Sequence, residues 1–168
     1  MDDLIKNKVE ESGLKVIDLS VFVTEDKPLF FDLSNFLFQG LILREKEYRQ
    51  KLAEFDWTIY KDKTVLVFCS TDAIVPVWAY MLSVVYLSNY SNKIHYISPD
   101  KWIEKQIIEA IQNINSEDYF NARVVIKGCG DEKIPESAYF EITKKLLPVV
   151  KSILYGEPCS TVPIYKKK

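Results

Sequence analysis

Between residues 64 and 155 the chain alternates short apolar runs with longer helical stretches, and this alternation constrains the fold most. Strands are predicted at residues 64–68, 94–97, 122–127 and 149–155 from their Val, Ile and aromatic content. Helices between successive strands imply parallel pairing with right-handed crossovers. The sequence therefore predicts an α/β fold, a three-layer doubly wound and mainly parallel sheet, with an irregular aromatic-rich N-terminal region.

The three intervening helices carry start and stop signals. Residues 70–72, Ser-Thr-Asp, together with Pro76 predict a helix that reaches residue 88. Because this helix is apolar nearly all round, we expect it to be central and buried. Ser98 and Pro99 open a second helix, with isoleucines on one face at positions 103, 107, 111 and 114. Pro135 opens a third, which must end before Pro148.

The N-terminal third is less regular. A strand is predicted at residues 16–19 and a helix at 43–55, with a helical turn at 2–12. The segment Phe30 to Phe38 is too rich in aromatics to stay exposed. We expect it to pack over a sheet edge or to form a homo-oligomer interface.

Length and composition favour one domain that acts inside the cell. The 168 residues suit one domain, and we find no internal repeat, low-complexity tract or linker, so residues 1–168 are predicted as a single α/β domain. A net charge of −2 predicts no nucleic acid or membrane partner. The longest apolar stretch, residues 73–87, is too short and polar to span a bilayer. Three cysteines without a secretory signal predict a reducing, cytoplasmic location.

The three cysteines each follow a predicted strand. Cys69 comes directly after residues 64–68, Cys129 two residues after 122–127, and Cys159 four residues after 149–155. Open parallel sheets bind ligands beyond the carboxyl ends of their strands. If the strands share one such edge, the three thiols converge, so Cys69, Cys129 and Cys159 are predicted metal ligands.

The surroundings of the three thiols differ. Cys69 precedes a predicted helix N-terminus, which would stabilise a thiolate, although a cysteine can also simply close a buried strand. Cys129 lies between Gly128 and Gly130 and before Asp131. Glycines allow a close approach to a ligand and amides can cradle an anion, so Gly128, Gly130 and Asp131 are predicted cofactor-binding residues. Cys159 lies in a predicted irregular loop, residues 156–163, stiffened by two prolines.

Three functions stay open at this point. The first is a thiolate-ligated metal or iron–sulfur protein, in which zinc would take Asp72, Asp131 or Glu157 as a fourth ligand. The second is a thiol enzyme or sulfur carrier with a low-pKa cysteine. The third is a non-catalytic interaction scaffold. No nucleotide-binding glycine motif and no nucleophile elbow is present, and the single histidine, His95, is expected to be structural.

Four segments resemble a known family when taken together. They are FLFQGLILREK at 36–46, CSTDAIVP at 69–76, VVIKGCGD at 124–131 and GEPCSTVP at 156–163. The chain resembles the uncharacterised bacterial family known as Domain of Unknown Function 2480, over nearly its whole length. The resemblance implies no particular activity or catalytic residue. By association, it implies iron–sulfur assembly proteins as partners.

Overall fold

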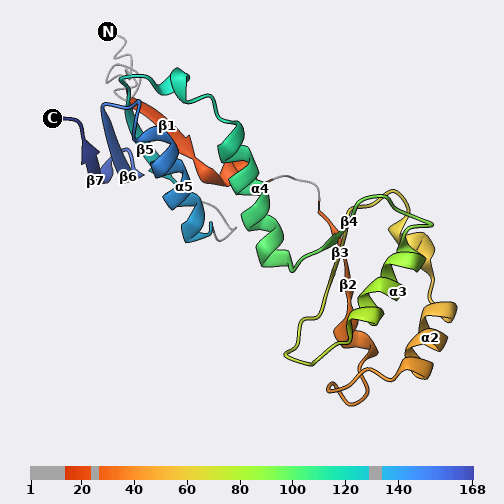
Figure 1. The fold of residues 1–168 in the computed structure, drawn as a ribbon. Coiled ribbons are helices and arrows are strands. Elements are labelled where there is room, and N and C mark those ends of the chain that lie inside the picture. The colour runs from red at the N-terminus through yellow and green to blue at the C-terminus, as the bar shows by residue number, and fades with distance from the viewer. Residues whose placement is uncertain (1–13, 24–26, 129–133) are drawn as a thin grey trace, which may run out of the picture. The chain divides into compact units, whose positions relative to one another are not determined.

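The computed structural model describes residues 14–23, 27–128 and 134–168 (Figure 1). The chain divides into two compact units. Unit 1 comprises Met1–Thr24 and Ile103–Lys168, and unit 2 comprises Glu25–Trp102. The helical turn predicted at residues 2–12 lies outside the described residues. In the sequence, unit 2 therefore lies between the first strand of unit 1 and the remaining elements of unit 1.

Unit 2 contains a three-stranded parallel sheet. Its strands lie in the order β2 (Leu29–Asp32), β3 (Val65–Phe68) and β4 (Ile94–Tyr96). Helix α2 (Glu45–Glu54) connects β2 to β3, and α3 (Val77–Leu87) connects β3 to β4. The predicted strands at 64–68 and 94–97 and the predicted helix at 43–55 are thus confirmed.

The core of unit 2 is unusually aromatic. Phe31 on β2 stacks on Trp57 with ring centroids 5.3 Å apart, and Phe36 packs edge-on against Tyr48 of α2. Both phenylalanines come from the aromatic-rich segment, and both are buried. This segment therefore forms strand β2 at the sheet edge and fills the core of its own unit, which accounts for its composition.

Helix α3 differs from its prediction in two ways. It begins at Val77, whereas Pro76 and the residues directly before it are not helical. It buries only one face, through Ala79, Ser83 and Leu87. The expectation of a helix buried all round is wrong for the described structure, because four of its apolar residues are exposed, namely Val77, Met81, Val84 and Val85.

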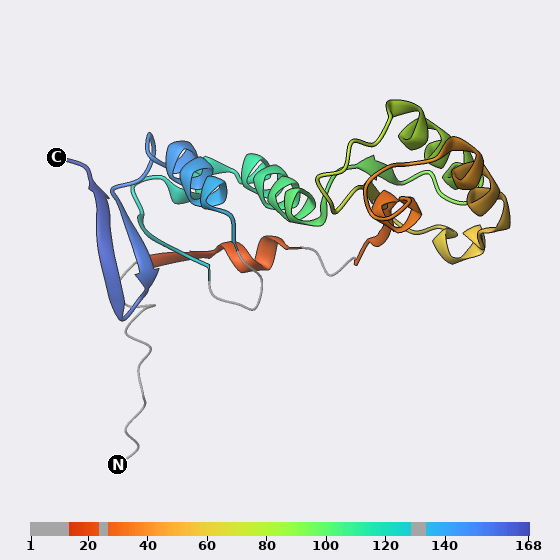
Figure 2. The same ribbon diagram turned by 90° about the horizontal axis from the view of Figure 1, so that it is seen from below.

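Unit 1 contains a four-stranded mixed sheet, in the order β1 (Leu14–Asp18), β5 (Arg123–Lys127), β6 (Ser152–Glu157) and β7 (Ser160–Lys166). The first three strands are parallel, and β7 is antiparallel to β6. Figure 2 shows β6 and β7 as neighbouring arrows at the C-terminal end of the chain. Helices α4 (Pro99–Asn113) and α5 (Glu136–Leu146) match the two predicted helices.

Strand β7 was not predicted, because the sequence at residues 156–163 resembles an irregular loop. Gly156 takes a φ of +112°, which lets β6 continue to Glu157 instead of stopping. Pro158 and Cys159 then form a tight turn into β7. Pro163 pairs with Leu154 beside a register shift, on an edge strand where a missing N–H is tolerated.

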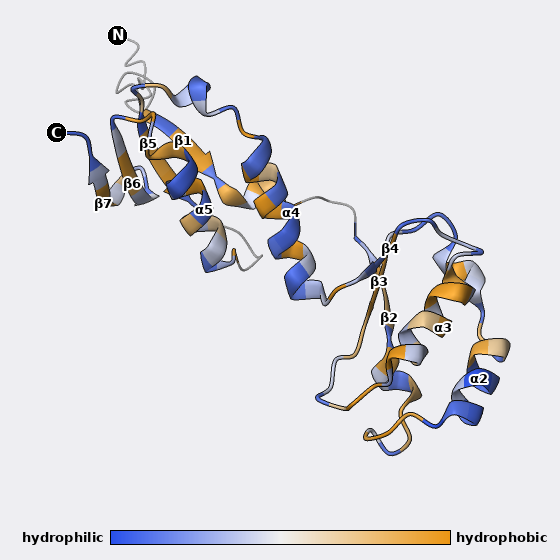
Figure 3. Ribbon diagram, in the orientation of Figure 1, coloured by the Kyte–Doolittle hydropathy of each residue, from blue (hydrophilic) through white to orange (hydrophobic). Residues whose placement is uncertain are grey.

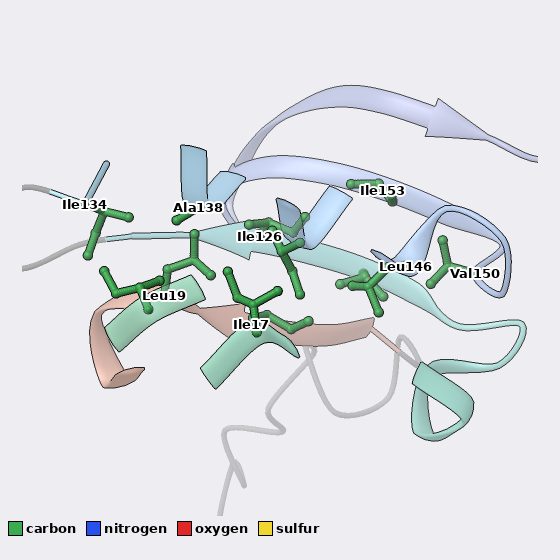
Figure 4. Close-up of a cluster of buried hydrophobic side chains, with 12 residues drawn as sticks. Ile17, Leu19, Ile126, Ile134, Ala138, Leu146, Val150 and Ile153 are labelled. Atoms are coloured by element: carbon green, nitrogen blue, oxygen red, sulfur yellow. The ribbon is translucent and has the colours of Figure 1, made fainter. Parts of the chain in front are cut away.

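Each unit has its described helices on one face of its sheet. In unit 1, Ile107 of α4 and Ile142 of α5 join one core with Val124, Ile126 and Ile153 of the strands (Figure 4). In unit 2, α2 and α3 share a core with β2 and β3 in the same manner. The mixed α/β class is confirmed. The three-layer doubly wound sheet is not, since the strands form two sheets.

The two units are offset copies of one fold. Helices α3 and α5 begin and end the same number of residues apart, since 136 − 77 and 146 − 87 both equal 59. The same offset relates the registers, in which Val65 opposes Ile94 in unit 2 and Val124 opposes Ile153 in unit 1. The same offset separates the last residue of α2 from the last residue of α4. It also separates Asp62 from Asn121, both of which have a positive φ. We call residues separated by this offset equivalent.

The first strand of each unit repeats as well, at a shorter offset. Residues 17–22 read Ile-Asp-Leu-Ser-Val-Phe and residues 31–36 read Phe-Asp-Leu-Ser-Asn-Phe. In both, the aspartate ends the strand and caps a 3₁₀ helix by accepting a hydrogen bond from the serine N–H. The absence of an internal repeat, expected from the sequence, is thus wrong. In sequence, unit 2 follows the first strand and 3₁₀ helix of unit 1, and it repeats the three parallel strands and two helices of unit 1 without a counterpart of β7.

The prediction of a single domain can be tested with a substitution in one unit and a probe in the other. All three tryptophans, Trp57, Trp78 and Trp102, lie in unit 2. Ile111→Ala in unit 1 should cost about 2–5 kcal/mol of unfolding free energy, because Ile111 is buried in that core. In a single cooperative domain the tryptophan-fluorescence and circular-dichroism midpoints should fall together. A fluorescence midpoint left unchanged would show two independent domains.

Candidate functional site

The described cysteines belong to different sheets. Cys69 directly follows β3 in unit 2 and is half-buried, whereas Cys159 lies in the β6–β7 turn of unit 1 and is exposed. Both are free thiols. The predicted site residues Cys129, Gly130 and Asp131 lie outside the described residues. The strands before Cys69 and Cys159 do not share a sheet, so the premise that one sheet edge gathers all three thiols is wrong.

At the carboxyl edge of the unit 2 sheet, Asp32 joins the ends of β2 and β3. One carboxylate oxygen, Oδ1, accepts hydrogen bonds from the N–H groups of Ser34 at 2.9 Å and Ser70 at 3.0 Å. The two serine hydroxyls are also hydrogen-bonded, at 3.0 Å. Burial opposes ionisation, but these hydrogen bonds outweigh it and hold the pKa of Asp32 below its usual value. Asp32 is therefore a carboxylate at neutral pH.

Cys69 lies beside this carboxylate and beside two tyrosines. Its thiol contacts the hydroxyl of Thr71, with 3.4 Å between sulfur and oxygen. The rings of Tyr80 and Tyr96 meet edge to face, 4.9 Å between centroids. Burial raises the pKa of Tyr80 to about 12, and the neighbouring Tyr96, Cys69 and Asp32 add to this rise. Tyr80 is thus close enough to Tyr96, Cys69 and Asp32 for all three to affect its ionisation.

The equivalent edge in unit 1 has a different charge balance. Lys127 ends β5 and contacts the carboxylates of Asp18 at 3.3 Å and Glu157 at 3.5 Å. Burial again opposes ionisation of Asp18, but hydrogen bonds from Ser20 and the charge of Lys127 outweigh it and lower its pKa. In unit 2 the equivalent of Lys127 is Phe68, and within the described parts of the chain no cationic side chain pairs with Asp32. Unit 2 therefore keeps a carboxylate whose charge is balanced only by hydrogen bonds.

Gly128 is needed for a packing reason. A Cβ at this position would collide with the hydroxyl of Tyr139 and press on Ile134. Its equivalent in unit 2 is Cys69, and Tyr80 is the equivalent of Tyr139. Cys69 and Tyr80 of unit 2 thus occupy the positions that Gly128 and Tyr139 occupy in unit 1. An anion cradle made with Gly128 stays a prediction.

The two units keep the same tyrosine pair at their carboxyl edges. Both tyrosines of the unit 2 pair are retained in unit 1, where Tyr139 and Tyr155 also meet edge to face at 5.6 Å. Core packing explains retained residues such as Ala79 and Ala138, which are fully buried. It does not explain Tyr96, which is 76% exposed. The tyrosine pair is thus a feature of the strand edge that both copies share.

The fourth ligands predicted for zinc lie apart from this arrangement. Glu157 contacts Lys127, and Asp72 is exposed in the segment before α3. In the parts of the chain that the structure describes, no three His, Cys, Asp or Glu side chains are grouped to hold one metal ion. Sequence reasoning missed Asp32, Tyr80 and Tyr96. The repeated Asp-Leu-Ser motif and the tyrosines at equivalent positions are the signals that could have found them.

The fold and this edge define a class, namely a duplicated α/β protein with a carboxylate, a thiol and a tyrosine pair at the strand ends of unit 2. The chain belongs to the family described as protein of unknown function DUF2480, whose model matches residues 3–167. No curated protein and no solved structure matches the chain. None of the described helices has the length and apolar character needed to cross a membrane.

The role of Asp32 in holding this edge predicts a pH-dependent stability effect. Asp32→Asn should lower the free energy of unfolding at pH 7 by about 1–3 kcal/mol, because two N–H groups lose a charged acceptor. A pKa lowered by folding stabilises the protein above the unfolded pKa, and this is lost as pH falls through the folded pKa. Urea unfolding should therefore show a smaller difference between variant and wild type near pH 3. An equal loss at both pH values would contradict this assignment.

Proposed function

We propose that this chain is a cytoplasmic thiolate-ligated metal or iron–sulfur protein, accessory to cluster assembly. The observation that supports it is the group of Asp32, Cys69, Tyr80 and Tyr96 at the carboxyl edge of unit 2. Of these groups, Asp32 is a carboxylate at neutral pH, and it has no cationic side chain paired with it among the described residues. A bound cation would balance its charge.

The same surroundings argue against an activated, metal-free thiolate. A reactive cysteine needs a positive environment, such as a helix N-terminus, a lysine or a histidine. Helix α3 begins only at Val77, so the dipole effect expected at Cys69 from the sequence is absent. A metal cation would stabilise both a thiolate and a carboxylate as ligands.

Unit 2 supplies part of a coordination sphere. Zinc normally takes four ligands, and Cys69 and Asp32 would provide two of them. The remaining ligands would come from a partner protein. A site completed by a partner suits a protein that passes a metal or cluster on, and it is the reason for proposing iron–sulfur assembly proteins as partners.

The proposal predicts metal that depends on Cys69. Protein purified without oxygen should contain zinc or iron by elemental analysis, and an iron–sulfur cluster should give visible absorption. Cys69→Ser should lower metal affinity at least about tenfold, as expected for the loss of a ligand. The same measurement on Cys129→Ser and Cys159→Ser will show which other thiols take part.

A matched control comes from the other unit. Asp18→Asn removes the equivalent carboxylate, which already pairs with Lys127, and should leave metal affinity unchanged while Asp32→Asn lowers it. A colourless protein that stays metal-free after incubation with zinc, or with iron and sulfide, would contradict the proposal. Fast iodoacetamide labelling of Cys69 at low pH in such a protein would favour a sulfur carrier instead.

A further inference from the structure

Helix α3 has an exposed apolar face that its own unit does not cover. Val77 is 74% exposed, Met81 65% and Val85 63%, and these residues recur at intervals of four along one side of the helix. Val84 and the preceding Ile74 extend this surface, and Tyr96 at the end of β4 is exposed as well. We call these six residues the α3 face. Figure 3 shows α3 in orange and pale tones, without the strongly blue turns seen in α2.

The equivalent helix in unit 1 is an internal control. Helix α5 has the same length and the same buried positions, with Ala138, Ile142 and Leu146 in place of Ala79, Ser83 and Leu87. On the outer side, however, α5 carries Glu136, Thr143 and Lys144 where α3 carries Val77, Val84 and Val85. The shared fold therefore does not require apolar residues there. The apolar side chains of α3 need another explanation, and an exposed apolar patch of this size typically marks an interface.

The two units also differ in what lies beside the last parallel strand. In unit 1, β7 pairs with β6, and Ile164 of β7 lines a hollow of about 310 Å³ together with Tyr139 and Thr143 of α5. In unit 2 the chain passes from β4 directly into α4. Among the described strands, β4 pairs only with β3. Among the described residues of unit 2, no strand lies beside β4 in the position that β7 takes beside β6 in unit 1.

We propose that a second copy of this chain covers the α3 face, with α3 packed against α3 across a two-fold axis. Charge is the first reason, because residues 77–87 include no charged side chain. Two copies can therefore meet without like-charge repulsion, which an isologous interface must avoid. Geometry is the second reason, because a two-fold axis beside the sheet brings two β4 edges together antiparallel, the direction in which β7 pairs with β6.

The size of the surface is consistent with a dimer. The six residues of the α3 face expose between 41% and 90% of their areas. Their combined surface is several hundred Å², on the scale of the roughly 800 Å² that each partner contributes to a stable interface. The α3 face shares Tyr96 with the group that supports the proposed metal site, but the dimer itself requires no bound metal.

The test transfers the outer residues of α5 onto α3. The triple variant V77E, V84T and V85K gives α3 side chains that the same fold already carries in unit 1, so folding should be preserved. Sedimentation velocity across a concentration series, with reductant to prevent disulfides, should show a wild-type dimer. The triple variant should raise the dimer Kd at least about 100-fold, because apolar residues at an interface centre dominate its affinity.

The matched control is Phe140→Ser, at the position equivalent to Met81 but on α5, which should leave the Kd unchanged. Hydrogen exchange of the wild-type protein provides a second measurement if the triple variant misfolds. Amides of α3 and β4 should become more protected as protein concentration rises. A wild-type monomer at about 100 µM would overturn the proposal. So would a dimer whose Kd the triple variant leaves unchanged, or α3 protection independent of concentration, which would show a cover from within the chain.

Discussion

Both units depend on an aspartate that ends their first strand. Its carboxylate accepts a backbone N–H two residues on, which turns the extended chain into a 3₁₀ helix at that point. In unit 2 the same oxygen also accepts the N–H of Ser70, so it ties the loop after β3 to the end of β2. Together with the pairing of β2 and β3, this hydrogen bond helps to hold Cys69 in position relative to the neighbouring strand. The local fold and the candidate site therefore rest on the same group.

The regular elements could be predicted because their signals are local. Continuous apolar runs give β3 and β5, and the prolines at 99 and 135 mark helix starts. The division into two sheets could not be read in this way, because strand order depends on pairing between residues far apart in the sequence. The repeat stayed hidden for a related reason. Core positions accept different apolar residues of suitable volume, so Tyr48 and Ile107 occupy equivalent buried sites without resembling each other.

The candidate site was only half visible in the sequence. Cysteines attract attention because they are few, and Cys69 does lie at the carboxyl end of a parallel strand, as the general rule requires. Asp32 and Tyr80 are ordinary residues in an aromatic-rich segment and an apolar helix, and nothing local distinguishes them. Their closeness to Cys69 becomes visible only in the folded structure, where β2 pairs with β3 and Tyr80 lies near the thiol. The rule for parallel sheets identified the right kind of edge, but the chain has two such edges.

Comparison of the two copies distinguishes the residues that the fold requires from the residues that are particular to one unit. Buried positions are kept in both copies even where their residues differ, whereas the outer face of the last helix is mostly polar in one copy and apolar in the other. Lys127 neutralises its edge in unit 1, and its equivalent Phe68 leaves Asp32 without that partner. Unit 2 thus combines an apolar helix face with an unbalanced acidic edge, while unit 1 has neither. Since the same fold occurs with and without these two features, the fold does not require them, and we propose an interface and a bound cation to account for them.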